Sequence, residues 1–179
     1  MDLHAEDAAL IPATIATSRL TLRLLVPADD AAVVAALADW QVVRWLTAVP
    51  WPFTPVDAAH FRRVIAGVPA HPHWALDAGA GLIGVISVKP DLGYWLSSRA
   101  HGQGYMSEAA RAVIAAIFAV NSAPLVSGHL LDNGPSRAVL RKLGFRDTAI
   151  ASVAHRATGG AVDVQRMVLT PQDWQARHA

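Results

Sequence analysis

The sequence predicts a single domain of the mixed α/β (α+β) class, with a mostly antiparallel sheet of six to seven strands and helices on both faces. Its 179 residues are the length of one domain, and no internal repeat or linker divides them. Strand patterns come first and then alternate with helix patterns, an order typical of a mixed sheet. We expect the domain to span residues 18–170, with an N-terminal extension at 1–17 and a C-terminal tail at 171–179.

The first third of the chain predicts one strand and two helices. Residues 19–24 alternate polar and apolar side chains with a period of two, which suits a half-buried strand. The segment Pro27-Ala28-Asp29-Asp30 ends this strand and caps a helix over residues 31–38. A second helix begins at Thr54-Pro55-Val56-Asp57. The bridge between the two helices, residues 40–53, is rich in tryptophan and proline.

The rest of the chain predicts a meander followed by alternating elements. Three short apolar runs separated by tight turns, at 74–76, 82–88 and 92–96, predict three successive antiparallel strands. A long helix follows, and it is apolar on nearly every face, so we expect it to be buried. The helix covers residues 104–119. It is followed by a strand at 125–131, a helix at 135–143, and strands at 145–150 and 162–169.

The composition excludes several classes of function. A formal charge of +1 cannot support a large counterion-release interaction with nucleic acid. The absence of cysteine excludes disulfides, thiolate metal sites and a cysteine acyl-enzyme. His71 and His73 have no third ligand spaced nearby, so we predict no metal site. Apolar stretches such as residues 112–120 are far shorter than the ~20 residues of a membrane span. We therefore predict a cytoplasmic protein that binds neither nucleic acid nor a membrane.

A glycine turn precedes the long central helix. Gly102 and Gly104 carry no β-carbon, so a diphosphate could approach the backbone N–H groups of Gln103, Gly104, Tyr105 and Met106. The alternative is a turn that merely joins a strand to a helix. Dinucleotide binding is disfavoured, because the three-glycine fingerprint is absent and the turn follows an antiparallel meander. A Walker A loop is excluded, because no Lys-Ser or Lys-Thr follows the turn.

A second polar pair lies at the entrance of the next helix. Asn133 follows the strand predicted at 125–131, where its side chain could cap the helix or hydrogen-bond the amide arm of a pantetheine group. Ser136 lies in the first helical turn. A hydroxyl there either bonds the backbone or protonates a departing thiolate.

These segments resemble the acyl-CoA signature of the GNAT superfamily of N-acetyltransferases. The family's coenzyme loop, written as Gln or Arg, two residues, Gly, one residue, then Gly or Ala, is matched by His101-Gly102-Gln103-Gly104-Tyr105-Met106. His101 and Met106 depart from the pattern, but the binding groups are backbone amides. Further similar pieces point to the ribosomal-protein N-terminal (alanine) acetyltransferase-like branch. They are Ser18 to Arg23, Leu82 to Ile86, Gly93 to Leu96, and Asn133 to Phe145.

The resemblance implies direct transfer of an acetyl group from acetyl-CoA, the cosubstrate, to a primary amine on a protein or peptide N-terminus or on a small molecule. It implies that backbone N–H groups of residues 94–97 polarise the thioester carbonyl and that Ser136 is the general acid. The base is open among Asp91, His73, His129 and Glu108, with Asp91 taken as the catalytic candidate. The residues expected to bind the coenzyme are Leu96, Gly102, Gln103, Gly104, Tyr105, Met106, Asn133 and Ser136.

Two alternatives and two further expectations remain. The chain could be a noncatalytic acyl-CoA-binding regulatory module, or a transferase that modifies small molecules such as antibiotics. Four aromatic side chains of the bridge either wall the acceptor pocket or pack over the edge of the core: Trp40, Trp45, Trp51 and Phe53. An exposed strand edge near the C-terminus predicts a homodimer.

Overall fold

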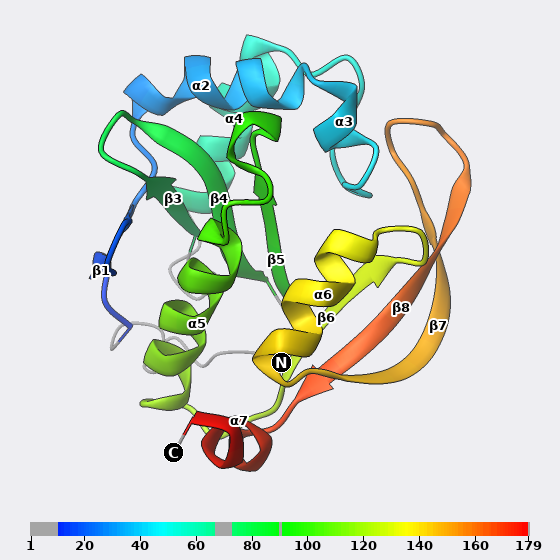
Figure 1. Ribbon diagram of the computed structural model, residues 1–179. Helices are drawn as coiled ribbons and strands as arrows, with labels where there is room; N and C mark the ends of the chain where they lie inside the picture. Colours follow the sequence, from blue (N-terminus) through cyan, green and yellow to red (C-terminus); the bar gives the residue numbers. More distant parts are fainter. Residues whose placement is uncertain (1–10, 67–72, 90, 179) are drawn as a thin grey trace.

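The computed structural model describes residues 11–66, 73–89 and 91–178, and it contains two antiparallel sheets (Figure 1). Five strands form the first sheet in the order β1-β2-β3-β4-β5: β1 (Ile15–Ala16), β2 (Thr21–Arg23), β3 (His73–Asp77), β4 (Leu82–Lys89) and β5 (Asp91–Leu96). Three strands form the second in the order β6-β8-β7: β6 (Leu125–Leu130), β7 (Arg146–Ala154) and β8 (Ala161–Leu169).

Helices pack around both sheets. They are the short η1 (Pro27–Asp29) and η2 (Ser98–Ala100), and α2 (Asp30–Leu37), α3 (Trp40–Val43), α4 (Pro55–Ala66), α5 (Tyr105–Phe118), α6 (Gly134–Leu143) and α7 (Pro171–His178). In the view of Figure 1, α5 lies in front of the first sheet and α6 in front of the second. No helix in the described part of the chain is long and apolar enough to cross a membrane.

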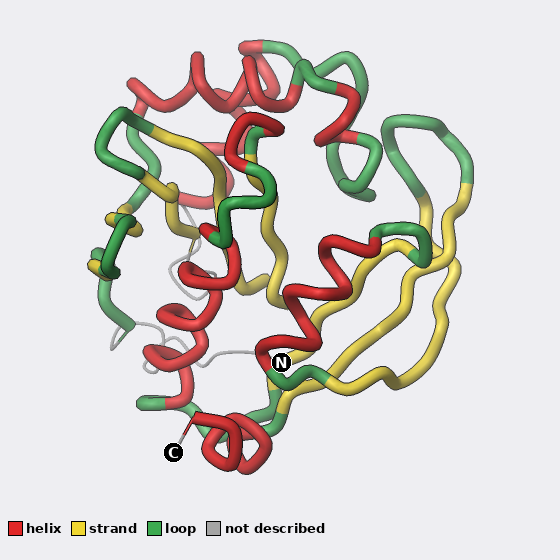
Figure 2. Tube along the Cα trace, in the orientation of Figure 1, coloured by secondary structure: helices red, strands yellow, loops and turns green. Residues whose placement is uncertain are grey.

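The structure confirms the mixed α/β class but divides the predicted sheet. We predicted one sheet of six to seven strands, whereas the strands form separate sheets of five and three. The traces of β5 and β6 diverge, and among the described residues no backbone ladder joins them (Figure 2). Side chains bridge the gap instead, because the Ser127 hydroxyl donates to the Leu92 carbonyl at 2.8 Å. An opening between β5 and β6 therefore separates the two sheets.

Both ends of the described chain carry structure that the sequence pattern did not predict. Strand β1 pairs with β2, so part of the expected N-terminal extension joins the first sheet. Helix α7 forms in the expected C-terminal tail, where the Trp174 ring packs against Phe118 with centroids 6.3 Å apart. Trp174 is buried, which fixes α7 to the end of α5.

Helix α5 is buried on one face only. Met106, Ala109, Val113 and Ile117 are among the side chains that it packs into the main core, between α5 and the sheets. Its opposite face is exposed at Arg111 and Ala115. The expectation of burial all round was wrong, because alanine tolerates the exposed face of a helix as well as its core face.

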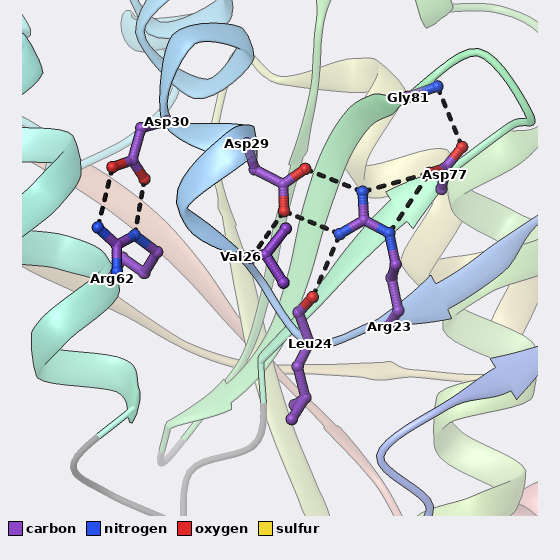
Figure 3. Close-up of polar contacts among 8 residues, drawn as sticks. All are labelled: Arg23, Leu24, Val26, Asp29, Asp30, Arg62, Asp77 and Gly81. Atoms are coloured by element: carbon purple, nitrogen blue, oxygen red, sulfur yellow. Dashed lines mark hydrogen bonds and ion pairs between the residues drawn. The ribbon is translucent and has the colours of Figure 1, made fainter.

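A partly buried ion cluster attaches the start of α2 to the first sheet (Figure 3). Arg23 donates to both carboxylate oxygens of Asp29, at 2.8 and 2.9 Å, and its Nη2 also pairs with Asp77 at 3.2 Å. The hydrogen bonds from Arg23 lower the pKa of Asp29, and burial opposes them. Asp30 in turn pairs with Arg62 at 2.9 Å, which joins α2 to α4. These helices and α3 pack over a second core that includes Val33, Leu37, Val43 and Phe53.

Candidate active site

A cavity of about 800 Å³ lies at the opening between β5 and β6. One side is formed by the glycine turn and the first residues of α5 and α6. The other side is formed by the segment after α3 and by β7 and β8. Seven of the residues predicted to bind the coenzyme line it, together with Asp91: Leu96, Gly102, Gly104, Tyr105, Met106, Asn133 and Ser136. Gln103 is not among the lining residues.

The glycine turn leaves the start of α5 open. Gly102 and Gly104 have φ angles of +73° and +80°, a left-handed conformation that other residues rarely adopt. Gly104 is the N-cap, and in the described residues no side chain hydrogen-bonds to the first turn of α5. The first backbone N–H groups of a helix have no partner within the helix. They and the helix dipole can therefore hold an anion here.

Arg19, in the segment between β1 and β2, supports this turn. Its guanidinium donates to the Gln103 carbonyl at 3.0 Å and lies 4.6 Å from the centroid of the Tyr105 ring. The Gln103 side chain turns away and donates to the Arg99 carbonyl at 2.8 Å. The Gln103 side chain thus holds the loop and does not face the cavity.

His101, which departs from the family pattern, has a structural partner. Its Nε2 lies 3.0 Å from the Leu96 carbonyl oxygen. Because a carbonyl only accepts, the ring donates through Nε2, and this bond fixes the end of β5 to the glycine turn. Replacement of the usual Gln or Arg by His101 therefore leaves the turn held in place.

The open edge of β5 presents backbone donors to the cavity. The N–H of Ser97 bonds to the Ile83 carbonyl on β4 at 2.8 Å, so it is not available to a ligand. Because N–H groups alternate between the two edges of a strand, those of Tyr94 and Leu96 point to the side of β6. Of the four residues 94–97, these two can therefore donate to a thioester carbonyl.

Ser136 and Tyr94 form a hydrogen-bonded pair in the cavity. The two hydroxyl oxygens are 2.9 Å apart, although the residues come from α6 and β5. Burial raises the pKa of Tyr94 to about 12, and the bond with Ser136 opposes this only in part. The phenol therefore stays protonated at neutral pH and can donate.

Asn133 has the capping role that its position allows. Its side-chain oxygen accepts a hydrogen bond from the Ser136 N–H at 3.1 Å, at the N-cap of α6. The cap places Ser136 in the first turn of the helix with its hydroxyl toward Tyr94. The side-chain nitrogen of Asn133, Nδ2, makes no hydrogen bond within the described residues. It can therefore still donate to a pantetheine carbonyl.

The four candidate bases separate by position. Asp91 lines the cavity, and its Oδ2 accepts from Arg166 at 2.6 Å. Glu108 lies instead on α5 facing Thr17, Ser18 and Arg19. Burial raises its pKa, but hydrogen bonds from those residues outweigh burial and lower it to about 2. Glu108 is thus an anchor of the fold and a poor proton acceptor.

The two histidines among the candidate bases also differ in whether they line the cavity. His73 does not line the cavity, and its ring packs edge-on against Phe61, with centroids 5.8 Å apart. His129 lines the cavity and is 4% exposed. Its Nδ1 bonds to the Leu130 carbonyl at 2.8 Å, whereas its Nε2 is buried without a partner among the described residues. The carbonyl requires the hydrogen on Nδ1, which leaves a lone pair on Nε2.

Sequence reasoning missed the Tyr94 phenol and Arg166. The strand alternation places Tyr94 on the same face as Leu92 and Leu96, but no sequence signal joins it to Ser136 on another element. Arg166 lies 75 positions from Asp91 and meets it through the packing of β8 beside β6. Contacts between distant segments of this kind have no local sequence pattern.

The sequence left two roles open for the aromatic residues of the bridge, which could wall the acceptor pocket or pack over the edge of the core. The structure places these residues differently from one another. Trp45 lines the cavity. Trp40 and Trp51 contact each other edge to face, with centroids 5.4 Å apart, and are about two-fifths exposed. Phe53 is buried in the second core.

Two diverging strands over a cavity, with an open helix start at one end, define an α/β protein that can bind an extended, phosphate-bearing molecule. Residues 19–146 match the family model of the acetyltransferase (GNAT) domain. The chain therefore belongs to the GNAT acetyltransferase family, as the sequence resemblance indicated.

Solved structures share this fold. An acetyltransferase of the GNAT family from Bacillus anthracis is 21% identical with a TM-score of 0.76, and the alignment covers 89% of this chain and 99% of that one. RimJ of Mycobacterium smegmatis, solved in complex with CoA-disulfide, is 18% identical with a TM-score of 0.75 and coverages of 86% and 83%. RimL, a ribosomal L7/L12 alpha-N-protein acetyltransferase solved in complex with coenzyme A, is 20% identical with a TM-score of 0.74 and coverages of 89% and 97%.

Proposed function

We propose that this protein is an N-acetyltransferase that moves an acetyl group directly from acetyl-CoA to a primary amine, on a protein or peptide N-terminus or on a small molecule. One observation carries the proposal. A single cavity joins the open start of α5 to the Ser136 and Tyr94 hydroxyls along the free edge of β5. RimJ and RimL, which share the fold, were solved with forms of coenzyme A bound.

The residues around the cavity fit the parts of acetyl-CoA. The N–H groups of residues 102–106 and the dipole of α5 suit the diphosphate. The side-chain amide of Asn133 and the backbone of Leu96 suit the amide groups of pantetheine. This arrangement directs the thioester toward the Tyr94 N–H, where a backbone donor to the developing oxyanion can contribute ~3 kcal/mol.

In the proposed reaction the neutral amine attacks the carbonyl carbon, and a carbon–nitrogen bond forms while the carbon–sulfur bond breaks. The CoA thiolate takes a proton from the Ser136 hydroxyl, and the proton that the nitrogen releases as the amide forms restores that hydroxyl. Tyr94, which is protonated at neutral pH, supports Ser136 by donating to its oxygen. Asp91 is the proposed acceptor of the proton that the incoming ammonium must lose. No group of three potential metal ligands is found among the described residues, and the proposal uses no metal.

The proposal is tested by release of free CoA thiol from acetyl-CoA in the presence of amines. An enzyme releases thiol only when an acceptor is present, and the acceptor gains an acetyl group detected by mass spectrometry. The alternative, a noncatalytic acyl-CoA sensor, binds acetyl-CoA but releases no thiol with any amine. A panel of peptides, amino acids, polyamines and aminoglycosides distinguishes the two.

A further inference from the structure

The cavity has a second side, away from the residues proposed to bind the coenzyme. In the β4–β5 register Val85 lies opposite Trp95, and Ser87 lies opposite Gly93. All four line the cavity, whereas the alternate residue Ile86 packs into the main core. The second side therefore rests on the face of β4 and β5 that is turned away from the main core.

Apolar side chains from three other parts of the fold enclose this side. The lining comes from the segment after α3, from α4 and from the second sheet, and includes Trp45, Leu46, Val49, Phe61, Val153 and Val164. The β7–β8 hairpin holds the segment after α3 in place. The Arg156 N–H donates to the Thr47 carbonyl at 2.8 Å, and His155 Nε2 lies 3.3 Å from the Arg44 carbonyl. Figure 1 shows the tip of this hairpin beside α3.

The charges on this side do not favour an acceptor that carries another ammonium group besides its reacting amine. Among the described residues that line the cavity, Asp91 supplies the sole carboxylate, and it is paired with Arg166. The Arg44 guanidinium already lies 4.3 Å from the centroid of the Trp45 ring. An additional ammonium group would lose water here without gaining a partner, which is costly. An apolar group gains about 25 cal/mol for each Å² removed from water.

We infer that this side is the acceptor subsite. It takes a primary amine attached to an uncharged, apolar group about the size of a phenyl ring. The inference rests on the proposed function and names its substrate class. The same chemistry is presented by a free arylalkylamine and by a peptide whose first residue is apolar.

Matched pairs of acceptors test the inference with the wild-type protein and acetyl-CoA. One pair is 2-phenylethylamine and 1,4-diaminobutane, and the other is two peptides that differ only in an N-terminal Phe or Lys. We expect kcat/KM to be at least about 10-fold higher for the apolar member of each pair. Comparison of the two pairs shows whether the source is a free amine or a peptide.

Two variants with a matched control locate the subsite. Trp45→Ala is expected to lower kcat/KM for 2-phenylethylamine about 10-fold while the KM for acetyl-CoA stays unchanged. Trp40→Ala removes an exposed tryptophan outside the cavity and is expected to leave both unchanged. Thr47→Asp places an unpaired carboxylate in the lining and is expected to shift the preference toward 1,4-diaminobutane. Thermal melting and acetyl-CoA binding confirm that each variant is folded.

Three results would overturn the inference. These are equal or better use of the diamine by the wild-type protein, equal losses in Trp45→Ala and Trp40→Ala, and an unchanged preference in Thr47→Asp. In each case acceptor-dependent thiol release still supports the proposed function. If no amine in the panel releases thiol, the proposed function itself fails, and the inference fails with it.

Discussion

At the scale of single residues, the proposed chemistry rests on Ser136 and Tyr94. Their oxygens are 2.9 Å apart in a partly buried corner, so the proton of one is held by the other. Ser136→Ala is expected to lower kcat about 100-fold and to leave acetyl-CoA affinity unchanged, because general acid catalysis contributes about 10²–10⁴ to the rate. Steady-state kinetics and equilibrium binding of acetyl-CoA measure the two effects.

Tyr94→Phe is the matched variant, since it keeps the ring and removes the hydroxyl. A decrease in kcat smaller than that of Ser136→Ala is expected, because Ser136 keeps its own proton. An unaltered kcat in Ser136→Ala would remove the general acid from the mechanism, and a larger loss in Tyr94→Phe would transfer that role to Tyr94.

Asp91 and His129 are the two candidate bases that line the cavity. Asp91→Asn keeps an oxygen that can accept from Arg166 but cannot take a proton. If Asp91 is the base, kcat/KM for the amine falls about 100-fold. The same measurement on His129→Asn is the comparison. A loss in His129→Asn alone would assign the base to His129 and contradict the role of Asp91.

At the scale of elements, the start of α5 is the proposed site of coenzyme binding. Gly104→Asp adds a negative charge where the diphosphate is expected, and we predict that the Kd for CoA rises about 10-fold or more. Isothermal titration calorimetry measures it. Gly159→Asp is the control, because Gly159 has a similar φ of +72° and open space around it in the β7–β8 turn. Equal affinities for CoA in wild type and Gly104→Asp would contradict the proposed site.

Glu108 anchors α5 to the segment between β1 and β2, and this contact makes stability depend on pH. Its folded-state pKa of about 2 lies below the ordinary value of 4.5, so its contribution is complete above pH 4.5 and is lost as pH falls toward 2. Glu108→Gln is expected to lower the free energy of unfolding by about 2 kcal/mol at pH 7, and by less at pH 3. Urea unfolding at both pH values measures the difference.

Arg111→Gln is the control for this measurement. It removes a charge from the exposed face of the same helix, and we expect a change within about 0.5 kcal/mol. A difference between wild type and Glu108→Gln that stays the same at pH 7 and pH 3 would show that the carboxylate is not the stabilising group.

At the scale of the whole molecule, the outer strand β7 of the second sheet has one free edge among the described residues. β7 pairs with β8 on one side, most of its residues are exposed, and Ile150 is 60% exposed. Free strand edges pair readily with other strands, so we predict a homodimer formed through β7. Ile150→Lys is expected to yield monomers in sedimentation experiments. Val56→Lys, at a 74% exposed position on α4, should stay dimeric. Monomeric wild-type protein would contradict the prediction.

The sequence pattern predicted most elements because their signals are local. Alternation marked β2, short apolar runs between turns marked the meander β3 to β5, and a glycine turn marked the start of α5. The short β1 and α3 and the terminal α7 were not predicted. Their stability comes from partners elsewhere in the chain, such as Phe118 for Trp174, and such contacts leave no period in the sequence.

The features of the candidate site also divide into those with a local sequence signal and those that depend on distant segments. Gly102, Gly104, Asn133 and Ser136 were predicted from sequence because each was expected to act through the backbone or the helix start next to it, and all four line the cavity. Glu108 was retained among the bases because its partners Thr17, Ser18 and Arg19 lie about ninety positions away and could not be seen. The opening between β5 and β6 was also invisible, since a strand's own sequence does not specify which neighbour it pairs with.

The sequence by itself determined the mixed α/β class, the family and the glycine turn before α5, because these depend on neighbouring residues. Only the tertiary structure decided that Tyr94 meets Ser136, that Arg166 engages Asp91 and that apolar walls enclose the second side of the cavity. Side chains from distant segments meet only after the chain has closed around its cores. The chemistry and the acceptor preference proposed here therefore follow from packing.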